Sequence, residues 1–179
     1  MGDGPPPGVR EVPEVRRASA GEFELAVEIL EEAAAWVAAR GQEGWKPGSF
    51  RDEAGSGRRV LRDTLDAGEL FLAWTARQAV GTVTLQSADP VYWPDAVDLA
   101  DARYVHRLAV RRGAKGLGLG RALLRWSEEL TAASGRPFTR LDCPARNPFL
   151  RAYYLAAGYG YRGDLTVGDF RASLFEKAL

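Results

Sequence analysis

Apolar and polar positions along the N-terminal third of the chain predict one short strand followed by two helices. The run Val15-Arg-Arg-Ala predicts a strand within residues 13–18. Apolar residues at three-to-four spacing then predict an amphipathic helix from Ser19 to about Arg40. Ser19 and Glu22 have the spacing of a capping box, which marks its start. A second helix is expected at 58–67, ahead of a glycine.

Runs rich in β-favouring residues dominate the next part of the pattern. Residues 69–75 and 79–85 are separated by a short polar stretch, which predicts an antiparallel hairpin. A connection of about fifteen residues, 87–101, follows, and loops of that length tend to be functional. Further strands are expected at 104–110, 137–143 and 170–178.

A glycine-rich loop lies between the strand at 104–110 and a helix whose apolar stripe begins at Leu119. Four glycines fall within 113–120, and four basic side chains surround them. The free N–H groups at a helix start, with the positive end of the helix dipole, favour an anion such as a phosphate. The spacing matches neither the Walker loop nor the dinucleotide G-x-G-x-x-G pattern, so a third kind of phosphate site is expected.

A second block follows the strand at 137–143. Asn147 directly precedes Pro148, which predicts a capped helix start, and Gly158 suits the end of that helix. Tyr154 lies seven residues after Asn147, and Tyr159 follows Gly158.

These two blocks resemble the GNAT superfamily of acyl-CoA-dependent N-acyltransferases. The family loop reads Gln/Arg-x-x-Gly-x-Gly/Ala between an aliphatic-x-Val strand end and a helix starting x-Ala-Leu-Leu. This chain has Leu108-Ala-Val110, Lys115-Gly-Leu-Gly118-Leu-Gly120 and Arg121-Ala-Leu-Leu124, with lysine as the one departure. The family pattern Asn-x-x-x-x-x-x-Tyr-x-x-x-Gly-aromatic is also met. The resemblance extends over about 15–178 and is strongest over 104–160.

The resemblance implies an α/β (α+β) GNAT fold and an acetyl-CoA site. A central mixed, mostly antiparallel sheet of six to seven strands would carry helices on both faces, in the order β-α-α-β-β-β-α-β-α-β-β. The backbone of the strand would pair with pantetheine, the loop would hold the pyrophosphate, and the Leu108 N–H would polarise the acyl carbonyl. The implied cofactor residues are Leu108, Ala109, Val110, Lys115, Gly116, Leu117, Gly118, Leu119, Gly120, Arg121, Asn147 and Tyr154.

Acyl transfer to an amine also needs a proton donor for the thiolate and an acceptor for the amine proton. Tyr154 has the position of the family's general acid, whereas Tyr153 would point elsewhere and is expected to be structural. His106 is the only imidazole, and arylalkylamine-type members carry histidine there in a proton relay. Asp142, Glu32 and water are alternative bases, and a structural histidine is the other interpretation.

The acceptor side is expected around aromatic and acidic residues. An aromatic or apolar amine would suit a pocket lined by several large rings, with Glu31, Glu32 or Asp95 pairing its ammonium. The candidate substrate residues are Glu32, Trp36, Trp45, Trp93 and Asp142, with Phe50 and Tyr92 as further contacts. Packing of Trp36 and Trp45 in the core is the competing interpretation.

Composition narrows the class of protein. The 179 residues suit one domain, with a disordered tail at 1–12 and a single acetyltransferase domain at 13–179. Twenty-four basic residues balance 24 acidic ones, so nucleic acid is not an expected partner. One cysteine and one histidine exclude a disulfide and a Cys/His-rich metal site, so no metal is expected. No signal segment or membrane-length apolar run stands out, and a reducing cytoplasm is the expected compartment.

The leading prediction is an N-acetyltransferase that moves the acetyl group of acetyl-CoA to a primary amine of a small molecule or peptide. Direct attack in a ternary complex is the expected mechanism, and a homodimer is one assembly that the family uses. A catalytically inactive CoA-binding regulatory domain is the first alternative, because the loop can bind CoA whether or not chemistry follows. A phosphate module for another nucleotide is the second.

Overall fold

The computed structural model describes residues 13–76, 78–94 and 98–179, and the predicted tail at 1–12 lies outside them. One seven-stranded mixed sheet has the order β1-β2-β3-β4-β5-β7-β6, in which only β4 and β5 run parallel. This confirms the predicted fold class. The strands are β1 (Glu14–Arg17), β2 (Leu70–Thr75), β3 (Gln78–Gln86), β4 (Ala102–Val110), β5 (Phe138–Pro144), β6 (Gly160–Val167) and β7 (Phe170–Ala178). The helices are α1 (Phe23–Ala38), α2 (Ser56–Asp66), α3 (Leu119–Ala133) and α4 (Pro148–Leu155).

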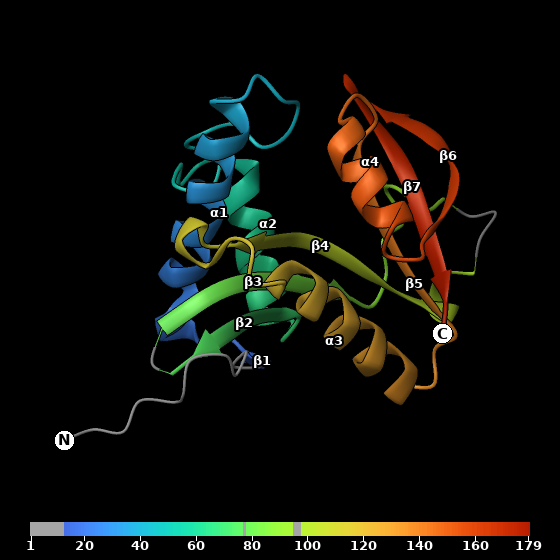
Figure 1. Ribbon diagram of the computed structural model, residues 1–179, viewed down its shortest axis with the longest axis horizontal. Helices are drawn as coiled ribbons and strands as arrows, with labels where there is room; N and C mark the ends of the chain where they lie inside the picture. The colour runs from blue at the N-terminus through green and yellow to red at the C-terminus, as the bar shows by residue number, and fades with distance from the viewer. Residues whose placement is uncertain (1–12, 77, 95–97) are drawn as a thin grey trace.

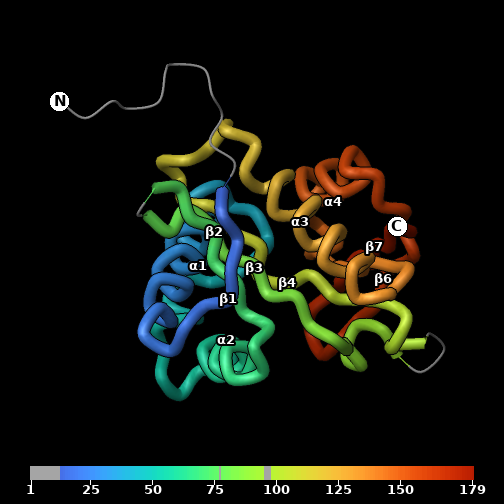
Figure 2. The backbone as a smooth tube through the Cα atoms, turned by 90° about the horizontal axis from the view of Figure 1, so that it is seen from below, coloured from blue at the N-terminus to red at the C-terminus, as the bar shows by residue number. Residues whose placement is uncertain are grey.

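The sheet consists of two halves that diverge from one short contact. β4 pairs with β5 only from Ala102 to Val105, although β4 continues to Val110. β1 to β4 with α1 and α2 form one half, and β5 to β7 with α4 form the other (Figures 1 and 2). The two halves therefore form a V that opens beyond Val105.

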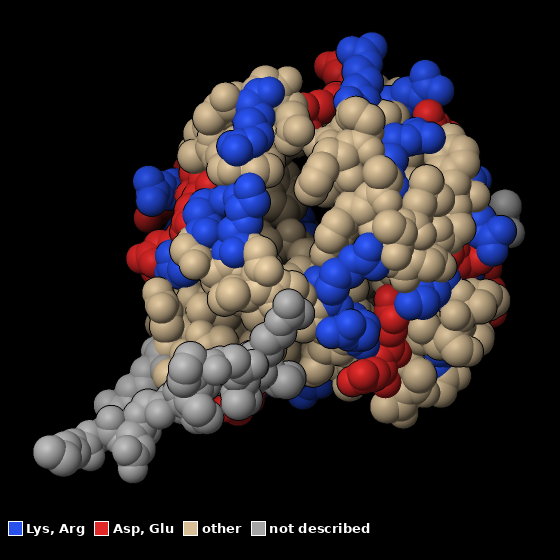
Figure 3. Space-filling model, in the orientation of Figure 1, with Lys and Arg blue, Asp and Glu red and all other residues tan. Residues whose placement is uncertain are grey.

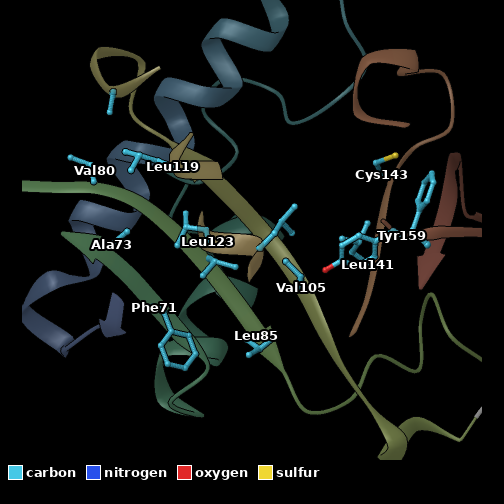
Figure 4. Packing of buried hydrophobic residues seen from close by; sticks show 14 residues of the cluster. Phe71, Ala73, Val80, Leu85, Val105, Leu119, Leu123, Leu141, Cys143 and Tyr159 are labelled. Atoms are coloured by element: carbon cyan, nitrogen blue, oxygen red, sulfur yellow. The ribbon is translucent and has the colours of Figure 1, made fainter. Parts of the chain in front are cut away.

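Two apolar clusters hold helices on opposite faces of the sheet. One cluster joins α1 and α2 to the sheet through Ile29, Leu30 and Leu61, among others. The larger cluster, on the other face, joins α3 to both halves, from Phe71 on β2 to Phe175 on β7. Figure 4 shows its side chains extending from Val80 and Leu123 across Val105 to Leu141 and Cys143. Burial of this shared core is what holds the V at a fixed opening.

Local signals in the sequence place most element boundaries correctly. The predicted capping box at Ser19 and Glu22 is present, but it caps the start of a short 3-10 helix, and α1 itself begins at Phe23. The second helix begins at Ser56, two residues before its expected start. The strand β6 has no residue-based prediction, because most of its side chains are exposed or half-buried and show no alternation. No helix in the described ranges is long and apolar enough to cross a membrane.

Candidate active site

The open edge of β4 is the first component of the site. Among the described residues, the backbone of β4 beyond Val105 has no partner strand on its β5 side, while β5 continues to pair with β7 up to Pro144. Leu108, Ala109 and Val110 lie on this open edge. An extended ligand can pair with such an edge as an added strand.

The glycine loop leads from this edge to the start of α3. Gly116 and Gly118 have φ values of 83° and 78°, a left-handed conformation that residues with a Cβ rarely adopt. Gly118 precedes the first helical residue, and no side chain caps the helix. In the described part of the chain, the N–H groups of Leu119, Gly120 and Arg121 donate to no acceptor. These N–H groups are an anion site of the kind that the sequence predicts.

Basic side chains line the mouth of the V. Arg121 lies over the ring of Tyr153, with 4.8 Å from guanidinium carbon to ring centre, and Lys115 is exposed at the tip of the loop. Figure 3 shows a hollow between the two halves with basic residues on both rims. A polyanionic ligand entering there meets positive charge before it reaches the helix start.

His106 lies deep in the V between two carboxylates. Its Nδ1 is 3.2 Å from Asp142 Oδ1, and its Nε2 is 3.0 Å from Asp89 Oδ2. The contact with Asp89 is short but not aligned as a hydrogen bond, so both of its atoms are buried without one. Asp89 Oδ1, in contrast, accepts from the N–H groups of Val91 and Tyr92 at 3.2 Å.

The charge state of this group differs from the sequence-based expectation. Burial of the imidazole opposes its protonation, but Asp142 and Asp89 outweigh burial and raise the pKa of His106 to about 9. Burial likewise acts against ionisation of Asp89, yet His106 keeps the pKa of that carboxyl below its ordinary value. At neutral pH His106 is therefore positively charged in the free protein, not the neutral base of an unperturbed imidazole.

Tyr153 and Tyr154 are neighbours on α4 with different surroundings. A Cβ built at Gly120 would lie 2.7 Å from the Tyr153 hydroxyl, so this hydroxyl touches the start of α3. Tyr154 packs against Tyr153, Tyr159 and Phe175. Burial raises the pKa of Tyr154, with Cys143, Asp142 and Tyr153 acting in the same direction, so its phenol stays protonated.

Asn147 organises the site through backbone contacts. Its Oδ1 accepts from the Leu150 N–H at 3.1 Å, which confirms the predicted helix cap. Its Nδ2 donates to the Glu43 carbonyl at 3.2 Å, from the loop that follows α1. Both amide groups are thus engaged, and only 2% of Asn147 is exposed. These contacts give Asn147 a positioning role for α4, and its predicted contact with the cofactor stays a prediction.

Glu32 and Trp36 lie beside the glycine loop and not on an acceptor pocket. Glu32 accepts from the Arg112 N–H at 2.5 Å and from Arg111 Nη1 at 3.4 Å. The ring of Trp36 has the guanidinium carbons of Arg40 and Arg112 each 4.0 Å from its centre. These contacts hold the loop against α1, and the substrate role predicted for the two residues stays a prediction.

The structure does not assemble the predicted aromatic pocket. Trp93 is 4% exposed and belongs to a separate core cluster with Tyr104, so it cannot contact an acceptor. Trp45 packs edge-on against Phe50, with 5.5 Å between ring centres. Tyr92 alone approaches the site, with its ring centre 6.3 Å from that of His106.

The acidic partners expected for an acceptor ammonium are also placed elsewhere or not described. Glu31 accepts from the N–H groups of Gly48 and Phe50, both at 2.7 Å, and thereby fixes the loop between α1 and α2. Asp95 lies outside the described residues. Asp142 is the one predicted substrate residue that the structure brings to His106.

Three residues of the site escaped the sequence analysis. Asp89 precedes a proline in the long loop, which predicts a turn. Nothing in that pattern indicates its contact with His106 on β4. Arg107 follows His106 in a strand and has nothing distinctive in the sequence. Tyr153 is one position away from the family's tyrosine, so the sequence predicts only a structural role for it. Its contact with the start of α3 depends on how α4 packs, which the sequence does not show.

Asp89, His106 and Asp142 also form the one group of potential metal ligands found among the described residues, with one ligand atom from each within 4.8 Å of the others. The two ring nitrogens face opposite carboxylates. A protonated imidazole between two carboxylates accounts for this geometry without an ion, because each ring nitrogen of the cation then lies within 3.2 Å of a carboxylate oxygen.

Two further surface hollows occur among the described residues. The larger, of about 370 Å³, is lined by residues of α1, the loop after it and Arg58 of α2, which pairs with Glu24. It contains none of the groups described above. The smaller, of about 220 Å³, lies between α3 and α4 beside Arg121, Arg125 and Lys177. The chemistry therefore belongs to the V and not to the larger hollow.

Comparison with known proteins decides the family. The acetyltransferase (GNAT) family model matches residues 26–159. The chain belongs to this family. The uncharacterized N-acetyltransferase YesJ of Bacillus subtilis is 30% identical over 155 residues, which is 84% of this chain and 82% of that protein. As a GNAT acetyltransferase, the chain is an N-acetyltransferase, and the V between β4 and β5 is its candidate active site.

Solved structures show the same fold. A GNAT acetyltransferase from Listeria monocytogenes has a TM-score of 0.73 at 25% identity, covering 93% of this chain and 95% of that one. The PaiA N-acetyltransferase of Thermoplasma acidophilum, solved in complex with coenzyme A, has a TM-score of 0.71 at 18% identity. The match covers 93% of this GNAT chain and 99% of PaiA.

Proposed function

We propose that the protein transfers the acetyl group of acetyl-CoA to a primary amine of a small molecule or peptide, by direct attack within the V. The observation that carries the proposal is a path that joins two segments with unpaired backbone, the open edge of β4 and the start of α3. Acetyl-CoA has a part for each segment of this path: a pantetheine arm with amides and a pyrophosphate. The coenzyme A complex of PaiA supports the assignment at the level of the fold.

The proposed cofactor site uses this chain's backbone more than its side chains. Leu108, Ala109 and Val110 pair with pantetheine, and the Leu108 N–H donates to the thioester carbonyl, where negative charge develops during attack. The segment from Lys115 to Arg121 holds the pyrophosphate. Lysine at the first loop position keeps a positive charge there, and the backbone N–H groups do not depend on it.

Direct attack is favoured over an acetylated cysteine intermediate. Cys143 is 2% exposed, and burial raises the pKa of its thiol to about 12. A thiol so buried forms almost no thiolate near neutral pH, and the thiolate is the nucleophile. The amine nitrogen therefore attacks the thioester carbon itself, and the bond from that carbon to sulfur breaks.

Two proton transfers accompany this exchange. The amine loses a proton, which we assign to the group of Asp89, His106 and Asp142, and the departing thiolate gains one from the neutral phenol of Tyr154. His106 accepts a proton only after it has lost its own, so the base form grows in as the pH rises toward about 9. Asp142 influences both His106 and Tyr154, which links the basic and the acidic side of the site.

The test combines binding with turnover. Calorimetric titration with acetyl-CoA is expected to show binding, and thiol release with a panel of amines is expected to show transfer. An inactive CoA-binding domain would bind without turnover for every amine, whereas absence of acetyl-CoA binding would refute the site itself.

Adjacent tyrosines on α4 provide a matched pair of variants. Tyr154→Phe is expected to lower kcat about 10²-fold, the lower range for loss of a general acid, with little change in acetyl-CoA affinity. Tyr153→Phe removes a hydroxyl of the same chemistry one residue away and is expected to change kcat less. Equal turnover in both variants and the wild type would remove Tyr154 from the mechanism. Cytoplasmic location, homodimeric assembly and independence from metal stay predictions.

A further inference from the structure

Arg107 occupies an unusual backbone position where the V begins to open. It is the second residue after Val105, the last residue of β4 that pairs with β5. On the other side, β3 pairs Thr84 with His106 and Thr82 with Ala109, so Arg107 falls within a bulge. Its φ is 48°, in the left-handed region that is unfavourable for an arginine. Bulges next to active sites re-aim side chains, and strain of this kind collects where function requires it.

The guanidinium of Arg107 has no hydrogen bond or ion pair within residues 13–76, 78–94 and 98–179. The side chain is nevertheless half-buried. Arg107 adjoins His106, whose ring lies between Asp89 and Asp142. Burial lowers the pKa of Arg107, and the negative charges of Asp142, Tyr92 and Asp89 oppose this effect. A poorly hydrated cation without a partner is costly, and an anion that pairs with it recovers that cost.

Arg140 shows how the same protein treats a buried arginine that has a structural role. Its side chain is 3% exposed, and it pairs with Asp101 at 2.9 Å and with Glu176 at 2.7 Å. It also donates to the Tyr104 hydroxyl at 3.0 Å. Arg107 has no comparable partner among the described residues, although it adjoins His106. Its free guanidinium is therefore a feature of the site and not of the fold.

The acceptor side carries both negative and positive side chains. Asp89 and Asp142 place two carboxylates around the single positive charge of His106, which leaves this group with a net negative charge. Arg107 offers a planar cation with several donors, which matches a carboxylate in a two-point contact. A simple amine would satisfy only the acidic groups. A ligand with an ammonium and a carboxylate would satisfy both.

We propose that the acceptor is an amino acid or a similar zwitterionic amine, whose carboxylate pairs with Arg107 while its amino group faces the Asp89, His106 and Asp142 group. This inference rests on the proposed function, because it assigns the acceptor of that same site. It replaces an aromatic amine as the expected substrate, since the rings that would have bound one are dispersed. Arg107 thereby becomes the residue that determines acceptor class.

The test uses acceptors that differ only in the carboxylate. Each of several amino acids is compared with its carboxamide and its decarboxylated amine by thiol release at saturating acetyl-CoA. For the wild type, kcat/KM is expected to favour the acid over its amide by about 10- to 100-fold, the range for hydrogen bonds to a charged group. Arg107→Gln is expected to bring this ratio close to one, and Arg107→Lys to leave part of it.

Controls separate acceptor recognition from folding and from cofactor binding. Arg103→Gln changes another arginine of β4, whose Nε donates to Ser134 outside the site, and the ratio of acid to amide should persist. Acetyl-CoA affinity of Arg107→Gln, measured by calorimetry, should match that of the wild type. If Arg107→Gln does not bind acetyl-CoA, Arg107→Lys, which keeps the charge, takes its place in the comparison of acid with amide.

The outcomes for the two proposals differ. If amides or decarboxylated amines are acetylated as well as the acids, the amino-acid assignment is wrong while the acetyltransferase stands. The same holds if acetyl-CoA binds and other amines react but no amino acid does. If acetyl-CoA does not bind, the proposed function itself fails.

Discussion

Proton binding by His106 couples the stability of the protein to pH in a range where few other groups titrate. The two flanking carboxylates raise the pKa of the imidazole from its ordinary 6.5 to about 9 in the folded state. A raised pKa in the folded state means that the protonated form stabilises the fold. The contribution is therefore complete below pH 6.5 and is lost as the pH rises through 9.

The magnitude follows from the difference between the two pKa values. At 1.36 kcal/mol per pKa unit, the limiting contribution is about 3 kcal/mol. Most of this contribution is lost between pH 6 and pH 9. Above pH 6.5 the unfolded chain releases its proton, so keeping His106 protonated in the folded state becomes steadily more costly until its own pKa of about 9 is reached. That loss is a large fraction of the total free energy of unfolding of a typical domain, about 5–15 kcal/mol.

Urea unfolding at pH 6, 7.5 and 9 measures this effect directly. The wild type is expected to lose about 3 kcal/mol of unfolding free energy over the series. His106→Gln keeps a hydrogen-bonding side chain but cannot titrate, so its stability should change much less. The buried thiol of Cys143 begins to contribute near pH 9, but equally in both proteins. Parallel pH profiles for the two proteins would refute the coupling of His106 to its carboxylates.

Three further predictions concern the glycine loop, the helix cap and the acidic group. Gly120→Ala places a methyl against the Tyr153 hydroxyl and is expected to weaken acetyl-CoA binding; adding Tyr153→Phe should restore most of it, and no rescue would contradict the contact. Asn147→Ala loses the helix cap and uncovers the Glu43 carbonyl, which should cost about 1–3 kcal/mol in urea unfolding. Asn147→Asp keeps the cap but places a buried carboxylate oxygen against the Glu43 carbonyl, so it should not be less costly than Asn147→Ala. Activity is expected to survive EDTA, because both nitrogens of His106 already face carboxylates; loss of activity that Zn²⁺ restores would show a metal site.

Local chemistry made the cofactor side of the site predictable. The conformation of Gly116 and Gly118, the start of α3 and the cap at Asn147 depend on residues within a few positions of each other. Such features appear in the sequence as spacing. The predicted loop, its flanking strand and the following helix were therefore placed correctly, and so was the α4 start.

Long-range packing decided the acceptor side, and the sequence carried no signal for it. Asp89 comes from a loop and Asp142 from another strand, yet both reach the imidazole of His106. An aromatic residue in a sequence shows no sign of whether it will stack on arginines, as Trp36 does, or fill a core, as Trp93 does. The pKa of His106 depends on the same unseen neighbours, which is why its charge state was wrongly anticipated.

The position of the split in the sheet has a consequence for how the chain folds during synthesis. Every strand of the first half precedes residue 111, and every strand of the second half follows residue 137. The ribosome therefore releases β1 to β4 with α1 and α2 before any part of the second half exists, and domains tend to fold as such units emerge. The large cluster on the α3 face stays incomplete until Leu141 and Phe175 arrive. The V that receives the substrates is thus also the seam at which an early and a late folding unit join.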